Sequence, residues 1–369
     1  MGITAEKSKI GMAELVVLLT VSGMARIFLS FPRSIIEISG PAAWLSSLTG
    51  LVITLIQVYI FYIIIKSQPS KNIVEISMDN LGSIGGTVVN LLFAAFFISV
   101  AALFTRTFSE ALITTALPRT PISVISTGYI LIGVLGAYVG LEAMARSSRI
   151  TYPFVLLGIA LLLLGLAPRW DYTQLFPLLG NGPLKVFGTG GVIAGIVTEV
   201  LLASVIVKSF HGPEMFRKIT LRAMMMGFAY FTILLMVLLL TFGWNVAQEH
   251  TMPFYMVSRL IYFGRFFQRV EAIFIIIWGY IGMVKVALTL YAAAVTIAGT
   301  LKLPDHRPLV FPLALIIFVV SLLPPDMTTA IRLESTLIRH IGLIPTMLLP
   351  IVILAANLIR KRMRKNEGG

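Results

Sequence analysis

The sequence predicts an all-α integral membrane protein with ten transmembrane helices. Three observations support this fold class: 57% of the residues are hydrophobic, only 12% are charged, and the mean hydropathy is +0.94. This is more apolar surface than the core of one soluble domain can bury. The apolar runs are about 20 residues long, enough to cross the hydrocarbon layer as helices. They lack the ten-residue alternation of a membrane barrel strand, so a barrel is excluded.

Hydropathy divides the chain into ten segments that form a single transmembrane domain. The predicted helices cover residues 11–37, 44–65, 87–116, 122–141, 145–166, 188–210, 218–244, 270–300, 309–323 and 337–359. The stretch after Lys7 and Lys9 is too long for a signal-peptide core and lacks a small-residue cleavage site, so we expect it to be the first helix.

Charge predicts the orientation of these helices. Loops 66–71, 146–149, 208–222 and 302–307 are rich in Lys and Arg, and they alternate with loops that are poorer in both. The positive-inside rule and an even helix number then predict that both termini are cytoplasmic. The net charge of +13 is explained in the same way, with no need for nucleic acid as a partner. Much of the excess lies in the tail residues Arg360, Lys361, Arg362, Arg364 and Lys365.

Two halves of five helices are predicted, as in transporters built from inverted repeats. They cover residues 10–166 and 186–360, followed by a short basic tail, 361–369. The first helix of each half is interrupted. In one half the interruption consists of Ser22, Gly23 and Met24, with Pro32 following; in the other it consists of Gly188, Gly190, Gly191, Gly195 and Thr198. Paired interruptions predict a binding site near the middle of the membrane, because unwound backbone offers free N–H and C=O groups to a ligand.

An alternative interpretation of these glycines is close helix packing. Gly191 and Gly195 have the GxxxG spacing, as have Gly136 and Gly140. For any single glycine we favour packing, and for the matched pair of interruptions we favour a site.

Ionisable residues inside apolar segments are costly and usually face a partner or a cavity. The candidates are Arg26, Arg106, Glu110, Glu199 and Lys285. Arg106 and Glu110 stand one helical turn apart, so a structural ion pair is predicted for them. Glu199 and Lys285 lack such a local partner, and they could pair across the bundle, bind ligand charges or relay a proton.

Other polar and sulfur-containing residues give weaker indications of a functional site. Thr289, one turn beyond Lys285, could bind a substrate or a helix carbonyl. Met224, Met225 and Met226 are interpreted as packing or lipid-facing side chains, not as a copper path. The sequence has no cysteine, and its histidines fall in predicted loops or near helix ends. We therefore expect neither a metal site nor a cofactor, and the absence of GxSxG, HExxH and P-loop motifs argues against an enzyme.

The sequence resembles the endospore germination permeases, the B subunits of nutrient germinant receptors, within the amino acid/polyamine/organocation (APC) transporter superfamily. Its most specific portion, 253–294, contains Arg269, Val270, Glu271, Trp278, Lys285, Leu290 and Tyr291 in the order typical of that family. Three further stretches match the pattern of that family. They are the starts of the second and fifth helices, 41–44 and 149–153, and a run that contains Leu175, Phe176, Pro177, Gly182, Pro183, Leu184, Lys185 and Gly188.

This resemblance implies a LeuT-like fold of ten helices in two inverted repeats, with a pocket between the interrupted first and sixth helices and the third and eighth. Carried over to this chain, the pocket comprises Ser22, Gly23, Met24, Leu103, Phe104, Gly195, Thr198, Glu199, Lys285 and Thr289. The resemblance also implies a membrane A subunit and a lipoprotein C subunit as partners, in the inner membrane of the spore.

Three functions remain open at this point. The first is a receptor subunit that senses a small nutrient germinant, with an amino acid as the favoured ligand. The second is a proton-coupled secondary amino-acid transporter, with Glu199 or Lys285 carrying the coupling charge. The third is a passive ion or water conduit that partner subunits open. We rank them in that order.

Overall fold

The computed structural model describes residues 10–261, 270–336 and 341–367, and this part of the chain is helical without a strand. The all-α prediction is confirmed. Short 3₁₀ turns connect several helices, and a π-helical turn, η7, covers Ile344–Leu348. The α-helices are α1 (Met12–Met24), α2 (Phe31–Ser39), α3 (Ala43–Ser67), α4 (Ile73–Thr115), α5 (Ile122–Val139), α6 (Leu141–Leu166), α7 (Pro183–Ile196), α8 (Glu199–Val205), α9 (Pro213–Ala247), α10 (Pro253–Ser258), α11 (Val270–Thr300), α12 (Arg307–Leu322), α13 (Met327–Thr336) and α14 (Leu349–Glu367).

Eight helical segments of the described chain are long and apolar enough to cross a membrane, and nine if the bent pair α12 and α13 counts as one span. The protein is therefore a multi-pass integral membrane protein, but the predicted number of ten is not confirmed. The difference lies in the predicted first helix: α1 has only 13 residues, and the chain then continues in a 3₁₀ turn, η1 (Ala25–Phe28).

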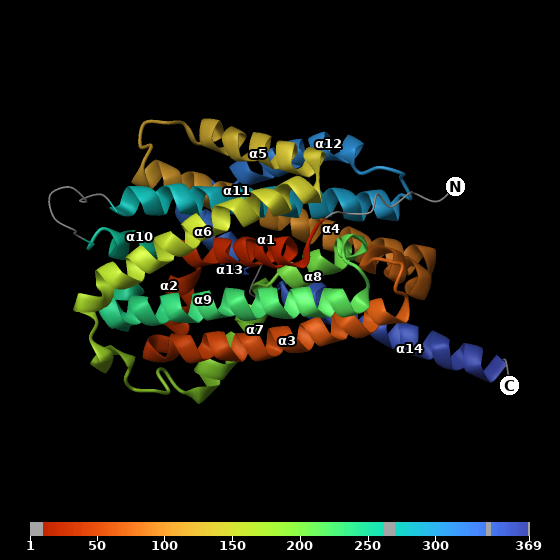
Figure 1. Cartoon of the computed structure of the whole chain (residues 1–369), viewed down its shortest axis with the longest axis horizontal. Coiled ribbons are helices and arrows are strands. Elements are labelled where there is room, and N and C mark those ends of the chain that lie inside the picture. The colour runs from red at the N-terminus through yellow and green to blue at the C-terminus, as the bar shows by residue number, and fades with distance from the viewer. Residues whose placement is uncertain (1–9, 262–269, 337–340, 368–369) are drawn as a thin grey trace.

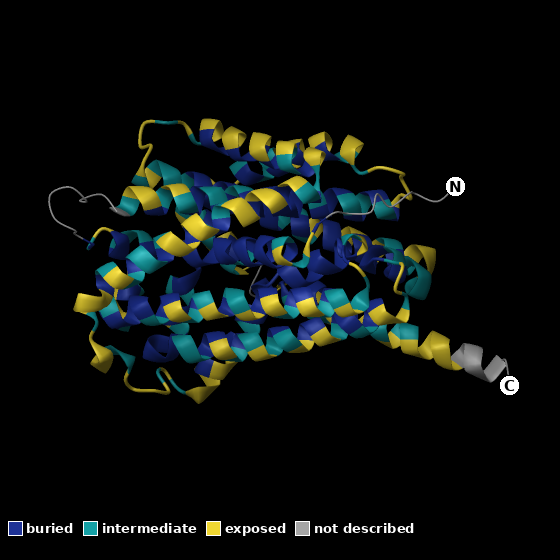
Figure 2. Ribbon diagram, viewed as in Figure 1, coloured by how far each residue is buried: buried dark blue, intermediate teal, exposed yellow. Residues whose placement is uncertain are grey.

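The long helices run side by side along the molecule (Figure 1). Helix α3 packs against α9, and α4 packs against α11. Helix α1 lies inside the bundle against α6, α9 and α11, and its ribbon is largely dark blue in Figure 2, which marks buried residues. A helix that is apolar on all sides and buried belongs to the protein interior, whereas the exposed apolar residues of α5, among them Leu131 and Leu135, face the lipid.

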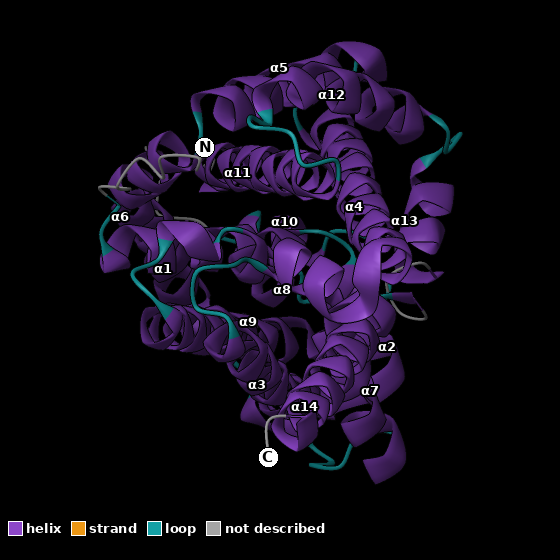
Figure 3. Ribbon diagram, turned by 90° about the vertical axis from the view of Figure 1, so that its right-hand side faces the viewer, coloured by secondary structure: helices purple, strands orange, loops and turns teal. Residues whose placement is uncertain are grey.

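The short helix α8 lies at the centre of this arrangement. It packs against α1, α3, α4, α9 and α11, and all seven of its residues are buried. Figure 3, which views the bundle end-on, shows it surrounded by these longer helices. A charged residue on α8 must therefore find its partner inside the protein.

Helix α4 begins well before the predicted start at residue 87. The Asn72 side chain accepts a hydrogen bond from the Glu75 backbone N–H at 3.0 Å, and the Glu75 carboxylate accepts one from the Asn72 N–H at 3.2 Å. This reciprocal cap satisfies two free N–H groups and starts the helix. At Gly82 the backbone φ is +75°, so the helix is kinked where a residue with a side chain would be strained.

The predicted sixth and tenth helices also differ in their bounds. The sixth begins at Pro183 and is divided into α7 and α8. Residues 337–340 of the predicted tenth helix lie outside the described residues, and α14 continues to Glu367, beyond the predicted end. Helix α10 lies in the connection between α9 and α11, of which residues 262–269 lie outside the described residues, and α13 follows α12.

The contact between α4 and α11 allows a packing test with two glycines one turn apart on α11. A Cβ at Gly282 would lie 2.7 Å from ring carbons of the buried Phe108, whereas a Cβ at Gly279 would meet only the Tyr129 hydroxyl at 3.8 Å. We expect Gly282→Ala to destabilise the protein by about 1–3 kcal/mol, because the Phe108 ring packs on Trp278 and Tyr129 and has no room to move.

The matched control is Gly279→Ala, which we expect to be neutral or slightly stabilising because alanine favours the helix. Thermal unfolding of both variants in detergent is the measurement. Equal shifts for the two variants would show that Phe108 does not fill the space beside Gly282.

Candidate functional site

The predicted first helix is interrupted, but just after the predicted residues, because Ser22, Gly23 and Met24 are the last residues of α1. Helix α1 ends at Met24, η1 follows, and Leu29 is extended with φ −99° and ψ −153° before α2 begins at Phe31. Pro32 at the start of α2 has no N–H to donate, which suits a helix start and does not suit a continuous helix.

The predicted sixth helix is interrupted as well, but only at Val197 and Thr198, because the predicted Gly188, Gly190, Gly191 and Gly195 lie within continuous α7. Helix α7 ends at Ile196, Val197 is extended with ψ 90°, and α8 starts at Glu199. A Cβ at Gly23 would lie 3.7 Å from the Glu199 carboxyl carbon, so the two interruptions lie next to each other. A methyl group at position 23 would be in ordinary van der Waals contact with the Glu199 carboxyl group, and only a larger side chain would crowd it.

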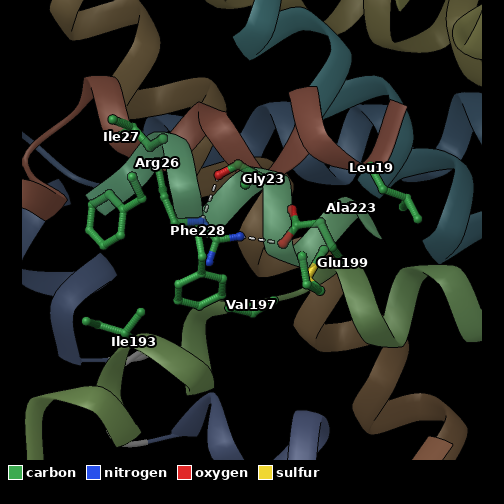
Figure 4. A pocket seen from close by; sticks show the side chains of 12 residues that line it. Leu19, Gly23, Arg26, Ile27, Ile193, Val197, Glu199, Ala223 and Phe228 are labelled. Carbon is green, nitrogen blue, oxygen red and sulfur yellow. Dashed lines mark hydrogen bonds and ion pairs between the residues drawn. The ribbon is translucent and has the colours of Figure 1, made fainter. Parts of the chain in front are cut away.

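Glu199 is the centre of a buried cluster of charges that we call the triad: Arg26, Glu199 and Lys285. The Glu199 Oε1 accepts hydrogen bonds from Lys285 Nζ at 2.6 Å and from Ser22 Oγ at 3.0 Å. The Glu199 Oε2 pairs with the Arg26 guanidinium (Figure 4). The Lys285 Nζ also donates to Thr198 Oγ1 at 2.5 Å. The triad thus joins α8, the 3₁₀ turn η1 and the middle of α11.

The triad carries one positive charge in excess, because two cations face one carboxylate. The side chains of Glu199, Lys285 and Arg26 are 0%, 1% and 8% exposed. Buried charges need partners, and removing one partner leaves an uncompensated charge that costs about 3–5 kcal/mol. The site therefore holds its own charges in place while still favouring an added negative group.

A small cavity of about 30 Å³ lies beside the triad, enough for one water molecule. Figure 4 shows Arg26, Gly23 and Glu199 on one side of it, with Phe228 and Ile193 among the other walls. The lining residues are Leu19, Gly23, Arg26, Ile27, Ile193, Val197, Glu199, Ala223, Met224, Gly227, Phe228 and Phe231. Charged groups thus meet a largely apolar wall.

Several predicted site residues lie around the triad. Ser22 and Thr198 bond to it, and the ring of Phe104 lies 5.4 Å from Lys285 Nζ, in cation–π range. Gly23 lines the cavity, and its carbonyl accepts a hydrogen bond from Arg26 Nε at 3.0 Å. The structure brings these residues together from segments far apart in the sequence.

Other predicted site residues do not line the cavity. Met24 and Leu103 are buried in the surrounding core. Gly195 instead allows close packing, since a Cβ there would meet Leu343 at 3.1 Å. The Thr289 hydroxyl donates to the Lys285 carbonyl of its own helix at 2.7 Å, which is the second of its two predicted roles.

Arg106 and Glu110 form an ion pair at 2.6 Å on α4, separate from the triad. Their side chains are 5% and 14% exposed, so the pair is largely desolvated. The ion pair that the i, i+4 spacing predicted is therefore present.

Sequence reasoning missed the wall that α9 contributes. Ala223, Gly227 and Phe231 recur every four residues and therefore share one helix face, with Phe228 beside them. The two small residues Ala223 and Gly227, one turn apart, were a usable signal. Met224 also lines the cavity and is buried, while Met225 is 56% exposed.

Comparison with known proteins decides the family. A family model described as "Spore germination protein" matches residues 9–330. The chain belongs to the spore germination permease family. Putative spore germination protein YfkT of Bacillus subtilis (strain 168) is 28% identical over 70% of this chain and 71% of its own length. Spore germination protein KB of the same organism is 23% identical over 99% and 98% of the two chains.

Solved transporter structures share the fold. Mhp1, a nucleobase-cation-symport-1 family transporter in a closed conformation with bromovinylhydantoin bound, has a TM-score of 0.65 at 14% identity, over 91% of this chain and 77% of its own. MhsT in complex with L-phenylalanine has a TM-score of 0.62 at 12% identity, over 96% and 99% of the two chains. The LeuT-like fold that the sequence predicted is thus confirmed.

Proposed function

We propose that this spore germination permease is the receptor subunit that senses a small nutrient germinant, an amino acid, at the junction of its two helix interruptions. The observation that carries the proposal is the buried triad at that junction, with its excess positive charge. A ligand carboxylate is the group that would neutralise this charge. MhsT, which shares the fold, is described in complex with an amino acid.

The remaining parts of an amino acid also find suitable neighbours. The Glu199 carboxylate, which lies at the junction of the interruptions, can accept hydrogen bonds from an ammonium group. The apolar wall that Ile27, Phe228 and Phe231 provide suits an aliphatic or aromatic side chain. Arg26 and Lys285 are the residues that we propose to contact the carboxylate.

Binding requires the site to open, because a cavity of about 30 Å³ holds one water and not an amino acid. A ligand carboxylate that replaces Glu199 on Arg26 would favour a conformation in which the two interruptions move apart. A ligand shifts such an equilibrium only by its difference in affinity for the two conformations. A sensor needs no more than this shift.

The wider setting of the proposal follows the resemblance. We propose that the chain is one domain built from two repeats, 10–166 and 186–360, with both termini on the cytoplasmic side of the spore inner membrane. We further propose that a membrane A subunit and a lipoprotein C subunit complete the receptor and convert the conformational shift into germination.

The test is the nutrient response of spores that lack this chain. We expect them to lose germination with one class of amino acid and to keep it with other nutrients, and the wild-type gene should restore the lost response. Neutral nutrients such as sugars serve as the comparison. A deletion that leaves every amino-acid response intact would contradict the proposal.

Proton-coupled transport of an amino acid is the second candidate, favoured by the buried Glu199–Lys285 pair and by the transporter fold. Transport predicts uptake of labelled amino acid into liposomes of the purified chain, faster with an inward proton gradient and lost in Lys285→Met. A sensor alone predicts saturable binding without accumulation. The two results separate the candidates.

A further inference from the structure

A second hollow, which we call the α14 groove, lies at the end of the bundle from which α14 projects (Figure 1). It has a volume of about 780 Å³. Its walls are the segment after α3, the first turns of α4 up to the kink at Gly82, and one face of α14. A Cβ at Gly82 would meet nothing within 4 Å, so the kink leaves the groove open.

The groove is lined by hydrogen-bond donors and by cations in excess. Arg360 and Lys361 line it from α14, and they make no ion pair within the described part of the chain. Lys71 is paired with Asp79 and so adds no net charge. The net charge of the lining is therefore about two positive charges, which suits a phosphate group.

Asn80 supplies a second and independent sign of a ligand. Its side chain lines the groove, and its Nδ2 is buried without a hydrogen-bond partner among the described residues. The Oδ1 of the same amide is already engaged, since it accepts from Gln68 Nε2 at 3.4 Å. A buried N–H group without a partner is costly, so a side-chain rotation that brings Nδ2 to an acceptor oxygen in the groove would stabilise the amide.

The surface of α14 beside the groove is apolar. Ile351 and Leu358 lie seven residues apart on one face of α14, they are 39% and 58% exposed, and Lys361 lies one turn beyond Leu358 on the same side. Arg360 and Lys361 follow directly at the end of this apolar surface. A molecule that touches both parts must carry an anionic head and hydrocarbon chains, which is the build of an anionic phospholipid and not of free phosphate.

We propose that the α14 groove binds the phosphate headgroup of an anionic phospholipid, whose acyl chains lie along the apolar face of α14. Arg360 and Lys361 attract the phosphate, and Asn80 Nδ2 donates to one of its oxygens. The lipid then bridges α14 to the α3–α4 connection, where one direct link is the 2.6 Å hydrogen bond from Asn357 Nδ2 to Ser67 Oγ. This site is separate from the triad.

Lipid binding to the full chain, purified in a neutral detergent, tests the proposal by native mass spectrometry. Phosphatidylglycerol and the zwitterionic phosphatidylcholine are the two lipid probes, and inorganic phosphate is the competitor. We expect phosphatidylglycerol to bind more tightly than phosphatidylcholine. Neutralising both cations in Arg360→Gln/Lys361→Gln should weaken phosphatidylglycerol binding by about fivefold for each charge removed.

The matched control is Arg119→Gln/Arg169→Gln, which removes two exposed arginines outside the groove, and phosphatidylglycerol binding should not change. Asn80→Asp adds a negative charge inside the groove and should also weaken binding. Equal affinity of the wild type and the Arg360→Gln/Lys361→Gln variant would overturn the proposal. Displacement of the lipid by millimolar inorganic phosphate would also overturn it, because the groove would then take free anions.

Discussion

Replacing Glu199 by glutamine is expected to destabilise the protein by about 3–5 kcal/mol, because Arg26 and Lys285 would then face each other in the interior without a carboxylate. Replacing Lys285 by methionine is expected to cost roughly half as much or less, since a neutral Arg26–Glu199 pair remains. Removing the carboxylate should therefore lower the stability of the protein more than removing one cation does. Thermal unfolding in detergent measures the difference.

The control for charge removal is Glu249→Gln, which changes an exposed carboxylate far from the triad and should alter stability by less than about 0.5 kcal/mol. Arg26→Gln gives a second comparison, since it also leaves a neutral pair, Lys285–Glu199. If Lys285→Met destabilised the protein as much as Glu199→Gln, the excess positive charge assigned to the triad would be wrong.

Gly23→Leu is expected to reduce sensitivity to the germinant roughly tenfold to a hundredfold. The position has room for one methyl group, with the Glu199 carboxyl carbon 3.7 Å from the site of a Cβ, but the further carbons of leucine would enter the cavity of about 30 Å³. In the opened site the leucine would occupy space that the germinant needs, and a cost of about 1–3 kcal/mol in the bound state weakens binding by about this factor. The measurement is the germination dose response of spores.

A matched glycine supplies the control for added bulk. Gly128 on α5 is exposed, and a Cβ there would meet nothing within 4 Å, so Gly128→Leu should leave the dose response unchanged. Both variants must accumulate to the wild-type level in spores. An unchanged dose response in Gly23→Leu would place the germinant elsewhere.

The features predicted well from sequence are those that local chemistry controls. Pro32 disfavours continuous helix wherever it occurs, and the first predicted helix is broken just before it, whereas the glycines of the sixth lie within α7 and the break follows them at Val197. The long apolar segments were also recognisable, because transfer into lipid depends on the segment itself. Helix starts set by side-chain caps, such as Asn72 with Glu75, lie outside the apolar runs, which explains the late predicted start of α4.

Contacts across the bundle could not be predicted in the same way. Hydropathy does not determine how a helix is rotated about its axis, so the sequence left three roles open for Glu199 and Lys285. The structure shows that they pair, and that Arg26 joins them from a position 173 residues away. Gly195 illustrates the same limit, because only the packing shows that it faces Leu343 and not the cavity.

The central claim is that the germinant binds at the triad, and equilibrium binding to the purified chain in lipid nanodiscs tests it most directly. The probe is a labelled amino acid of the class that triggers germination. Our account predicts saturable binding by the wild type and by Gly128→Leu, and at least a tenfold loss of affinity in Gly23→Leu. Equal affinity in all three proteins would contradict it.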